Sequence, residues 1–274
     1  MTTVQQQLLG ALLLACLPVG LIVYARLVLY VRRKGGRVRT DGIALPDAMV
    51  AAVLVGFLVQ LTVKMLMRGT AAESPKITAE QVLPNVVVFL GVLTLLLAFL
   101  YSRRVDVPRF FGLRGLKAGR ALVLALGFIV SAYPLLLLVG AITQTKLGGK
   151  AVEQDLVGIF REAVSQMNVR ALVAIAIAGA ITQPVVEEVF FRGYFYVVGK
   201  RYFGGIASAV GTSALFAAVH LNLTAFPALF VLALCLTLAY EITGSILVPI
   251  GMHALFNTSQ LAFLAWQAHA IPPQ

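Results

Sequence analysis

The residues in this sequence best suited to chemistry are two adjacent carboxylates, Glu187 and Glu188, which follow an apolar run over 171–186. Each charged residue near the centre of a membrane helix costs roughly 2.5–3.5 kcal/mol on insertion scales. Such a pair therefore needs a cationic partner, a bound proton or a chemical task. Arg192 lies four residues after Glu188, on the same helix face. An ion pair with Arg192 accounts readily for Glu188 and less well for Glu187.

Two further polar motifs interrupt later apolar runs. Phe216 precedes His220 by four residues, and His253 precedes Asn257 by the same interval, so each pair shares one helix face. At 1.5 Å per residue, counting from the intervening turns puts both histidines and Asn257 close to the depth of Glu187. We therefore expect these side chains to converge in one buried cavity.

Convergent glutamate, histidine and asparagine side chains suit hydrolysis. A desolvated glutamate is a better base near neutral pH, and a neighbouring histidine can orient the attacking water. A second histidine with an asparagine can stabilise an oxyanion through hydrogen bonds. Alternatively, Glu187, His220 and His253 could hold Zn²⁺ and leave one position open for water. The residues do not require a cofactor; if one is bound, zinc is the ion that they would hold. No serine or cysteine is placed as a persuasive nucleophile.

The composition predicts that these residues lie in a membrane. Of 274 residues, 60% are hydrophobic and 12% are charged, whereas soluble domains carry about 25% charged residues. The net charge of +11 is concentrated in loops beside apolar runs, which is where membrane proteins carry their topology signal. The expected surroundings are therefore a lipid bilayer, and we expect no nucleic-acid partner.

Eight apolar runs predict an all-α, polytopic bundle of about eight membrane helices, since about 20 residues span the ~30 Å of hydrocarbon. We divide the chain into N-terminal helices and basic loops (1–170) and a catalytic membrane core (171–268). The predicted helices cover 8–31, 46–67, 82–101, 121–143, 171 to about 199, 203–221, 225–242 and 246–266.

The loops predict the orientation. Basic clusters within 32–39, 103–120 and 192–201 belong in the cytoplasm under the positive-inside rule, which leaves both termini outside. The basic stretch 107–117, with aromatic and leucine residues between its charges, is expected to lie on anionic headgroups. The small size and the lack of eukaryotic targeting signals favour a prokaryotic inner membrane.

The order Glu-Glu-x-x-x-Arg, Phe-x-x-x-His and His-x-x-x-Asn on successive membrane helices resembles the CAAX-processing and bacteriocin-processing (CPBP, or Abi) membrane proteases. That family includes the type II CAAX prenyl endopeptidase, and the resemblance covers 171–262. It implies an endopeptidase that hydrolyses peptide bonds of membrane-associated proteins or peptides, with Glu187 activating water and His220 as its partner. The other implied roles are oxyanion stabilisation by His253 and Asn257, a catalytic contribution from Glu188, and support from Arg192 and Phe216.

Several alternatives stay open. Members of that family are often called metalloproteases, whereas a metal-free, glutamate-activated water is argued for the structurally studied branch. The chain could instead be a non-catalytic scaffold or immunity protein, or a proton- or ion-coupled carrier, because intramembrane glutamate and histidine also mark relays. Structural roles are available too: His220, His253 and Asn257 could join helices by hydrogen bonds. Pro184 is expected to kink its helix and free backbone carbonyls.

Overall fold

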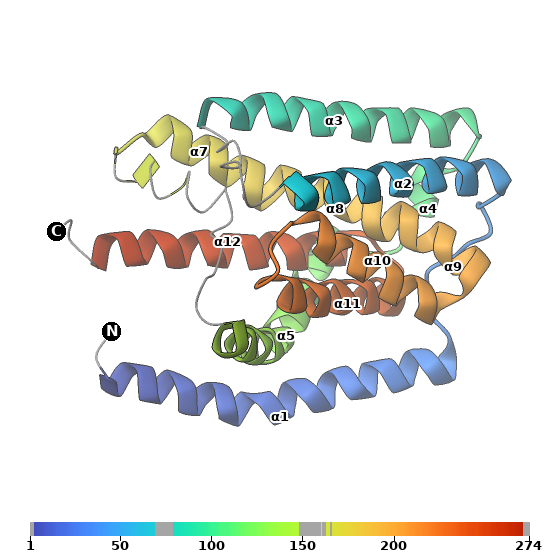
Figure 1. Ribbon diagram of the computed structural model, residues 1–274. Coiled ribbons are helices and arrows are strands. Elements are labelled where there is room, and N and C mark those ends of the chain that lie inside the picture. Colours follow the sequence, from blue (N-terminus) through green and yellow to red (C-terminus); the bar gives the residue numbers. More distant parts are fainter. Residues whose placement is uncertain (1–2, 69–78, 148–159, 161–162, 165, 271–274) are drawn as a thin grey trace.

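The computed structural model describes residues 3–68, 79–147, 160, 163–164 and 166–270, and these residues form helices without any strand. Figure 1 shows α1 (Thr3–Lys34), α2 (Leu45–Arg68), α3 (Ala79–Ser102) and α12 (Leu247–Ala270) running roughly parallel. Helix α5 (Ala118–Leu147) crosses between α1 and the rest of the bundle. The all-α bundle predicted from the apolar runs is confirmed. The remaining elements are α4 (Val107–Phe110), α7 (Val169–Ile177), η1 (Ala178–Thr182), α8 (Gln183–Glu188), η2 (Val189–Tyr196), α9 (Val197–Phe203), α10 (Gly205–Val219) and α11 (Phe226–Thr243).

Each of the eight predicted runs coincides with a helix, but the helices are not equally suited to crossing a membrane. Within the described residues, six helices are long and apolar enough to span it. Helix α10 has 15 residues, or about 22 Å, and α12 is not among the six. These two helices carry His220 at the end of α10 and His253 with Asn257 in α12. The six spans are Ala15–Lys34, Leu45–Met67, Val82–Ser102, Ala118–Lys146, Val169–Phe203 and Phe226–Thr243.

The fifth of these spans, Val169–Phe203, is one continuous helical rod that contains two π-helical segments, η1 and η2. It packs against α3 on one side and against α10 and α12 on the other. Helices α11 and α12 in turn pack against α5. Contacts therefore cross the expected boundary near residue 170 at several places, and the division of the chain there stays a prediction. The rod is the element that positions the two glutamates.

The loops that carry the basic clusters meet at one end of the bundle, which we call the basic end (residues 35–44, 103–117, 200–205 and 243–247). There Arg37 N–H donates to Glu241 O at 2.7 Å, and Lys200 Nζ donates to Val38 O at 2.9 Å. Ile246 N–H donates to Phe111 O at 3.0 Å. In Figure 1 the α1–α2 connection and α9 lie at this end, on the right, whereas α1 begins and α12 ends at the opposite side. The basic loops thus share one side of the bundle, as the charge pattern predicts.

Candidate active site

A π turn shapes the helix just before the glutamates. Gln183 N–H donates to Ala178 O, five residues back, instead of to Gly179 O. The next residue, Pro184, has no N–H to offer, so the Gly179 carbonyl lacks a donor from its own helix. Asn257 Nδ2, on α12, donates to that carbonyl at 2.7 Å. The proline therefore frees a backbone acceptor, as expected from the sequence, and a side chain from a neighbouring helix satisfies it. π segments of this kind occur often at functional sites.

Glu188 is the structural member of the pair. Its side chain is fully buried, and its Oε1 accepts hydrogen bonds from Arg192 Nη1 at 2.7 Å and from His253 Nδ1 at 2.9 Å. Arg192 is also buried, with 2% exposure, and its guanidinium lies 4.4 Å from the centroid of the Phe216 ring. This distance is typical of a cation–π contact. The i, i+4 ion pair expected from the sequence is present, and it is part of a wider network.

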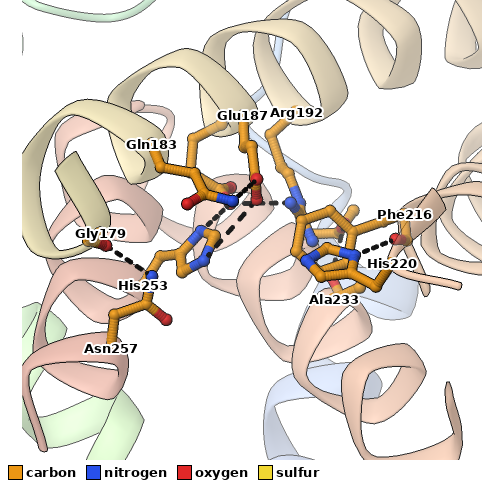
Figure 2. A network of polar contacts seen from close by, with 11 residues as sticks. Gly179, Gln183, Glu187, Arg192, Phe216, His220, Ala233, His253 and Asn257 are labelled. Atoms are coloured by element: carbon orange, nitrogen blue, oxygen red, sulfur yellow. Dashed lines mark hydrogen bonds and ion pairs between the residues drawn. The ribbon is translucent and has the colours of Figure 1, made fainter. Parts of the chain in front are cut away.

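Glu187 is held differently. Its side chain keeps 17% exposure, and its Oε1 accepts a hydrogen bond from Gln183 Nε2 at 2.7 Å. Its Oε2 is buried, has no hydrogen-bond partner among the described residues and lies 3.8 Å from His253 Nε2. Figure 2 shows Gln183, Glu187 and His253 pointing toward one another. One carboxylate oxygen is thus hydrogen-bonded, and the other is buried without a hydrogen-bond partner among the described residues.

The hydrogen bonds define which ring nitrogen of each histidine carries the proton. The Glu188 carboxylate can only accept, so His253 Nδ1 donates to it, and in the neutral ring Nε2 is then a bare acceptor. This nitrogen faces Glu187 Oε2, which is also an acceptor. In that state two buried acceptors face each other, and either a proton on Nε2 or a shared donor between the two atoms would stabilise the pair.

His220 also lies beside the Phe216 ring. Its Nδ1 is 2.7 Å from the Phe216 carbonyl oxygen. The Phe216 ring centroid is 4.8 Å from that of His220 and 5.8 Å from that of His253. Figure 2 places Phe216 and His220 beside Arg192, away from Asn257. In the described part of the chain, no hydrogen bond or ion pair joins His220 to Glu187; His253 occupies that position instead. The physical reason is local: α10 ends at Val219, and the His220 ring bonds a carbonyl of that last turn.

The zinc alternative does not fit this arrangement. Zn²⁺ in a catalytic site takes three protein ligands, and Glu187, His220 and His253 are the three that the sequence offered. No group of three or more histidine, cysteine, aspartate or glutamate side chains gathers closely enough to hold a metal ion among the residues described. The network therefore supports no chemical step through zinc.

Sequence reasoning missed Gln183. It lies four residues before Glu187, on the same face of the helix, so the i, i+4 rule could have found it. The other residues singled out from the sequence lie on α8, η2 and α12 and at the C-terminal end of α10. Asn257 is placed on the Gly179 carbonyl, and its amide retains a second N–H.

The fold and this network define a class: a polytopic α-helical membrane protein with a buried Glu-Glu-Arg-His-Asn centre. Residues 169–259 match a family model described as type II CAAX prenyl endopeptidase Rce1-like. The match confirms the resemblance inferred from the three motifs, and at family level it supports a membrane protease. The matched segment runs from the start of α7 into α12 and includes every side chain of the network. No curated protein and no solved structure was found to match the chain.

Proposed function

We propose that the protein is an intramembrane endopeptidase of the CAAX type, in a prokaryotic inner membrane, that hydrolyses peptide bonds of membrane-associated proteins or peptides. The observation that carries this proposal is the pair formed by Glu187 Oε2 and His253 Nε2, two acceptors 3.8 Å apart within an apolar bundle. A membrane-embedded hydrolase must hold its own water, and these atoms supply the two acceptors that a bound water needs.

The reaction follows from the same geometry. The water donates one hydrogen to Glu187 Oε2 and the other to His253 Nε2, which leaves an oxygen lone pair for the substrate carbonyl carbon. As the new C–O bond forms, Glu187 takes up a proton as general base. The tetrahedral intermediate then expels the amine: the C–N bond breaks, and the proton held by Glu187 passes to the leaving nitrogen. The products are a carboxyl group and an amine, with one water consumed.

The oxyanion of that intermediate needs hydrogen-bond donors. The family pattern assigns this role to His253 and Asn257. The geometry favours Asn257, because one of its N–H groups binds Gly179 O and the second remains for a ligand. His220 stays in the proposed site as the second histidine. Its Nδ1 donates to a carbonyl, so its Nε2 is also a bare acceptor.

The neighbouring glutamates divide the work. Glu188 is fully buried, and its Oε1 is shared by Arg192 and His253, which makes it an anchor for the ring that borders the water. Each glutamate has one oxygen without a hydrogen-bond partner among the described residues, but only Glu187 keeps side-chain exposure, at 17%, and only its Oε2 lies opposite His253 Nε2. We therefore assign the base to Glu187 and a supporting role to Glu188.

We propose that substrate first binds in an apolar surface groove on the α3 side of the helical rod. It has a volume of about 450 Å³ and lies between α3 and α7, which are neighbours in Figure 1. Its walls are apolar except for Arg170. Its lining residues are Val82, Leu83, Val86, Val169, Arg170, Val173, Ala174, Ile177 and Ala178.

The proposal is tested with purified protein in proteoliposomes and a fluorogenic peptide that ends in a CAAX-type sequence, with and without a farnesyl group. Glu187→Gln removes the base, so we expect cleavage to fall by about 10²–10⁴-fold. His269→Ala, at the third histidine of the chain, is the matched control and should cleave like wild type. Equal cleavage by Glu187→Gln and wild type would show that the assignment is wrong.

Two further arms separate the alternatives. Metal analysis of the folded protein and cleavage assays in a chelator test whether the protein binds zinc and needs it for cleavage. A scaffold or immunity protein would cleave neither peptide, and its Glu187→Gln variant would keep the cellular phenotype of the wild type.

A further inference from the structure

We propose that Gln183 is a positioning residue that decides which oxygen of Glu187 acts as the base. The inference rests on the proposed function and adds a residue to it. Gln183 Nε2 lies 2.7 Å from Glu187 Oε1. Because an ionised carboxylate can only accept, the amide nitrogen is the donor in this contact.

The contact leaves the two oxygens of Glu187 in different states. Oε1 has the Gln183 donor, whereas Oε2 has no hydrogen-bond partner among the residues described and faces His253 Nε2. A glutamate side chain has three rotatable bonds, and holding it in one orientation costs conformational entropy. The hydrogen bond to Gln183 offsets this cost before substrate arrives. It therefore keeps Oε2 directed at the position of the water.

Gln183 is itself held by the backbone. It is the first residue of α8, directly after the π turn of η1, and its N–H donates to Ala178 O. Pro184 follows it and fixes the backbone angle of the same turn. A glutamine in a membrane helix is costly unless its amide is hydrogen-bonded. The amide of Gln183 finds its partner in Glu187, one turn along the helix, so the two side chains stabilise each other.

The experiment compares Gln183→Met, which keeps the length of the side chain and removes the donor, with wild type on the same farnesylated peptide. We expect kcat to fall by about 10–100-fold, the effect of losing one hydrogen bond to a charged group. KM should change by less than about twofold, because the variant alters the reacting geometry and leaves peptide binding intact. Gln60→Leu, at an exposed position of α2, is the matched control and should keep both constants. Thermal unfolding in detergent is followed for each variant.

A second background distinguishes positioning from a general structural effect. Glu187→Ala lacks the carboxylate that Gln183 binds, so adding Gln183→Met should change the residual cleavage rate of that variant by less than about twofold. An equal loss in both backgrounds, or an unchanged kcat for Gln183→Met in the wild-type background, overturns the inference. So does a fall in kcat that is matched by a fall in unfolding temperature.

The wild type and Glu187→Gln are assayed in parallel to separate the two proposals. If the wild type shows no cleavage that depends on Glu187, the proposed function fails and the role of Gln183 falls with it. If the wild type cleaves and Gln183→Met cleaves equally well, only the role of Gln183 is wrong.

Discussion

His253 and Glu188 join two helices that are far apart in the sequence: Nδ1 of the histidine, on α12, lies 2.9 Å from Oε1 of the glutamate, on α8. The same oxygen accepts from Arg192 Nη1 at 2.7 Å. Through this shared oxygen Glu188 holds both Arg192 and His253 in place, whereas Glu187 is bonded only to Gln183 of its own helix. The same substitution should therefore change the stability of the protein at Glu188 and leave it nearly unchanged at Glu187.

Glu188→Gln should unfold the protein more easily, whereas Glu187→Gln should not. Without the Glu188 carboxylate, the buried Arg192 guanidinium loses its counter-charge, and breaking a buried ion pair costs about 3–5 kcal/mol. Glu187→Gln keeps a polar group of the same size beside Gln183 and should cost less than about 1 kcal/mol. Reversible unfolding in detergent measures both. Equal destabilisation by the two variants would contradict this division.

The cleavage rates of variants at His253 and His220 show which of the two histidines lies beside the water. His253→Ala removes the acceptor that faces Glu187 Oε2, so we expect kcat to fall by about 10²–10⁴-fold. His269→Ala again serves as the control. If His253→Ala keeps the wild-type rate and His220→Ala loses it, the water lies beside His220, as the family pattern implies. The placement beside His253 would then be wrong.

Much of this arrangement could be predicted because helix geometry is regular. The spacing of Glu188 and Arg192 placed both on one face, and counting residues from the turns brought Glu187 and His220 to similar depth. The direction in which each side chain points could not be predicted in the same way. It depends on where a helix ends and on whether a turn is α or π. His220 bonds the Phe216 carbonyl because α10 stops at Val219.

The π segments are the clearest example of what sequence patterns leave out. Pro184 indicated that a carbonyl would be freed, but neither the identity of that carbonyl nor its partner on α12 follows from periodicity. Glu241 illustrates the same limit. It is buried, and its Oε1 accepts hydrogen bonds from Tyr196 and Lys200, which lie far from it in the sequence. Such sites are formed by contacts between segments that are distant in the sequence, and local sequence patterns do not predict these contacts.

The hydrogen bonds that Tyr196 and Lys200 donate to Glu241 predict a strict requirement for glycine at position 36. A Cβ at Gly36 would lie 1.4 Å from Glu241 Oε2. The glutamate cannot move aside freely, because its other oxygen is held by Tyr196 and Lys200. Gly36→Ala should therefore destabilise the protein by about 1–3 kcal/mol, as overpacking does.

The matched control is Gly91→Ala in the interior of α3, where a Cβ meets open space. That variant should be neutral or up to about 1 kcal/mol more stable, because alanine favours a helix over glycine. Both variants are compared by thermal unfolding in detergent. If they unfold at the same temperature, the close approach of the α1–α2 loop to Glu241 is wrong.

The Gly179 carbonyl predicts that Asn257 and Pro184 are energetically coupled. Asn257→Ala leaves this carbonyl without its donor, which should cost about 1–3 kcal/mol of unfolding free energy. Pro184→Ala restores a backbone N–H, so the helix can return to α register and Gln183 N–H can donate to Gly179 O. Asn257→Ala should then cost at least about 1 kcal/mol less in the Pro184→Ala background. A double-mutant cycle from unfolding in detergent measures this difference, with Thr258→Ala, at an exposed position of α12, as the control for helix α12. An identical cost of Asn257→Ala in both backgrounds would mean that the proline does not create the acceptor that Asn257 fills.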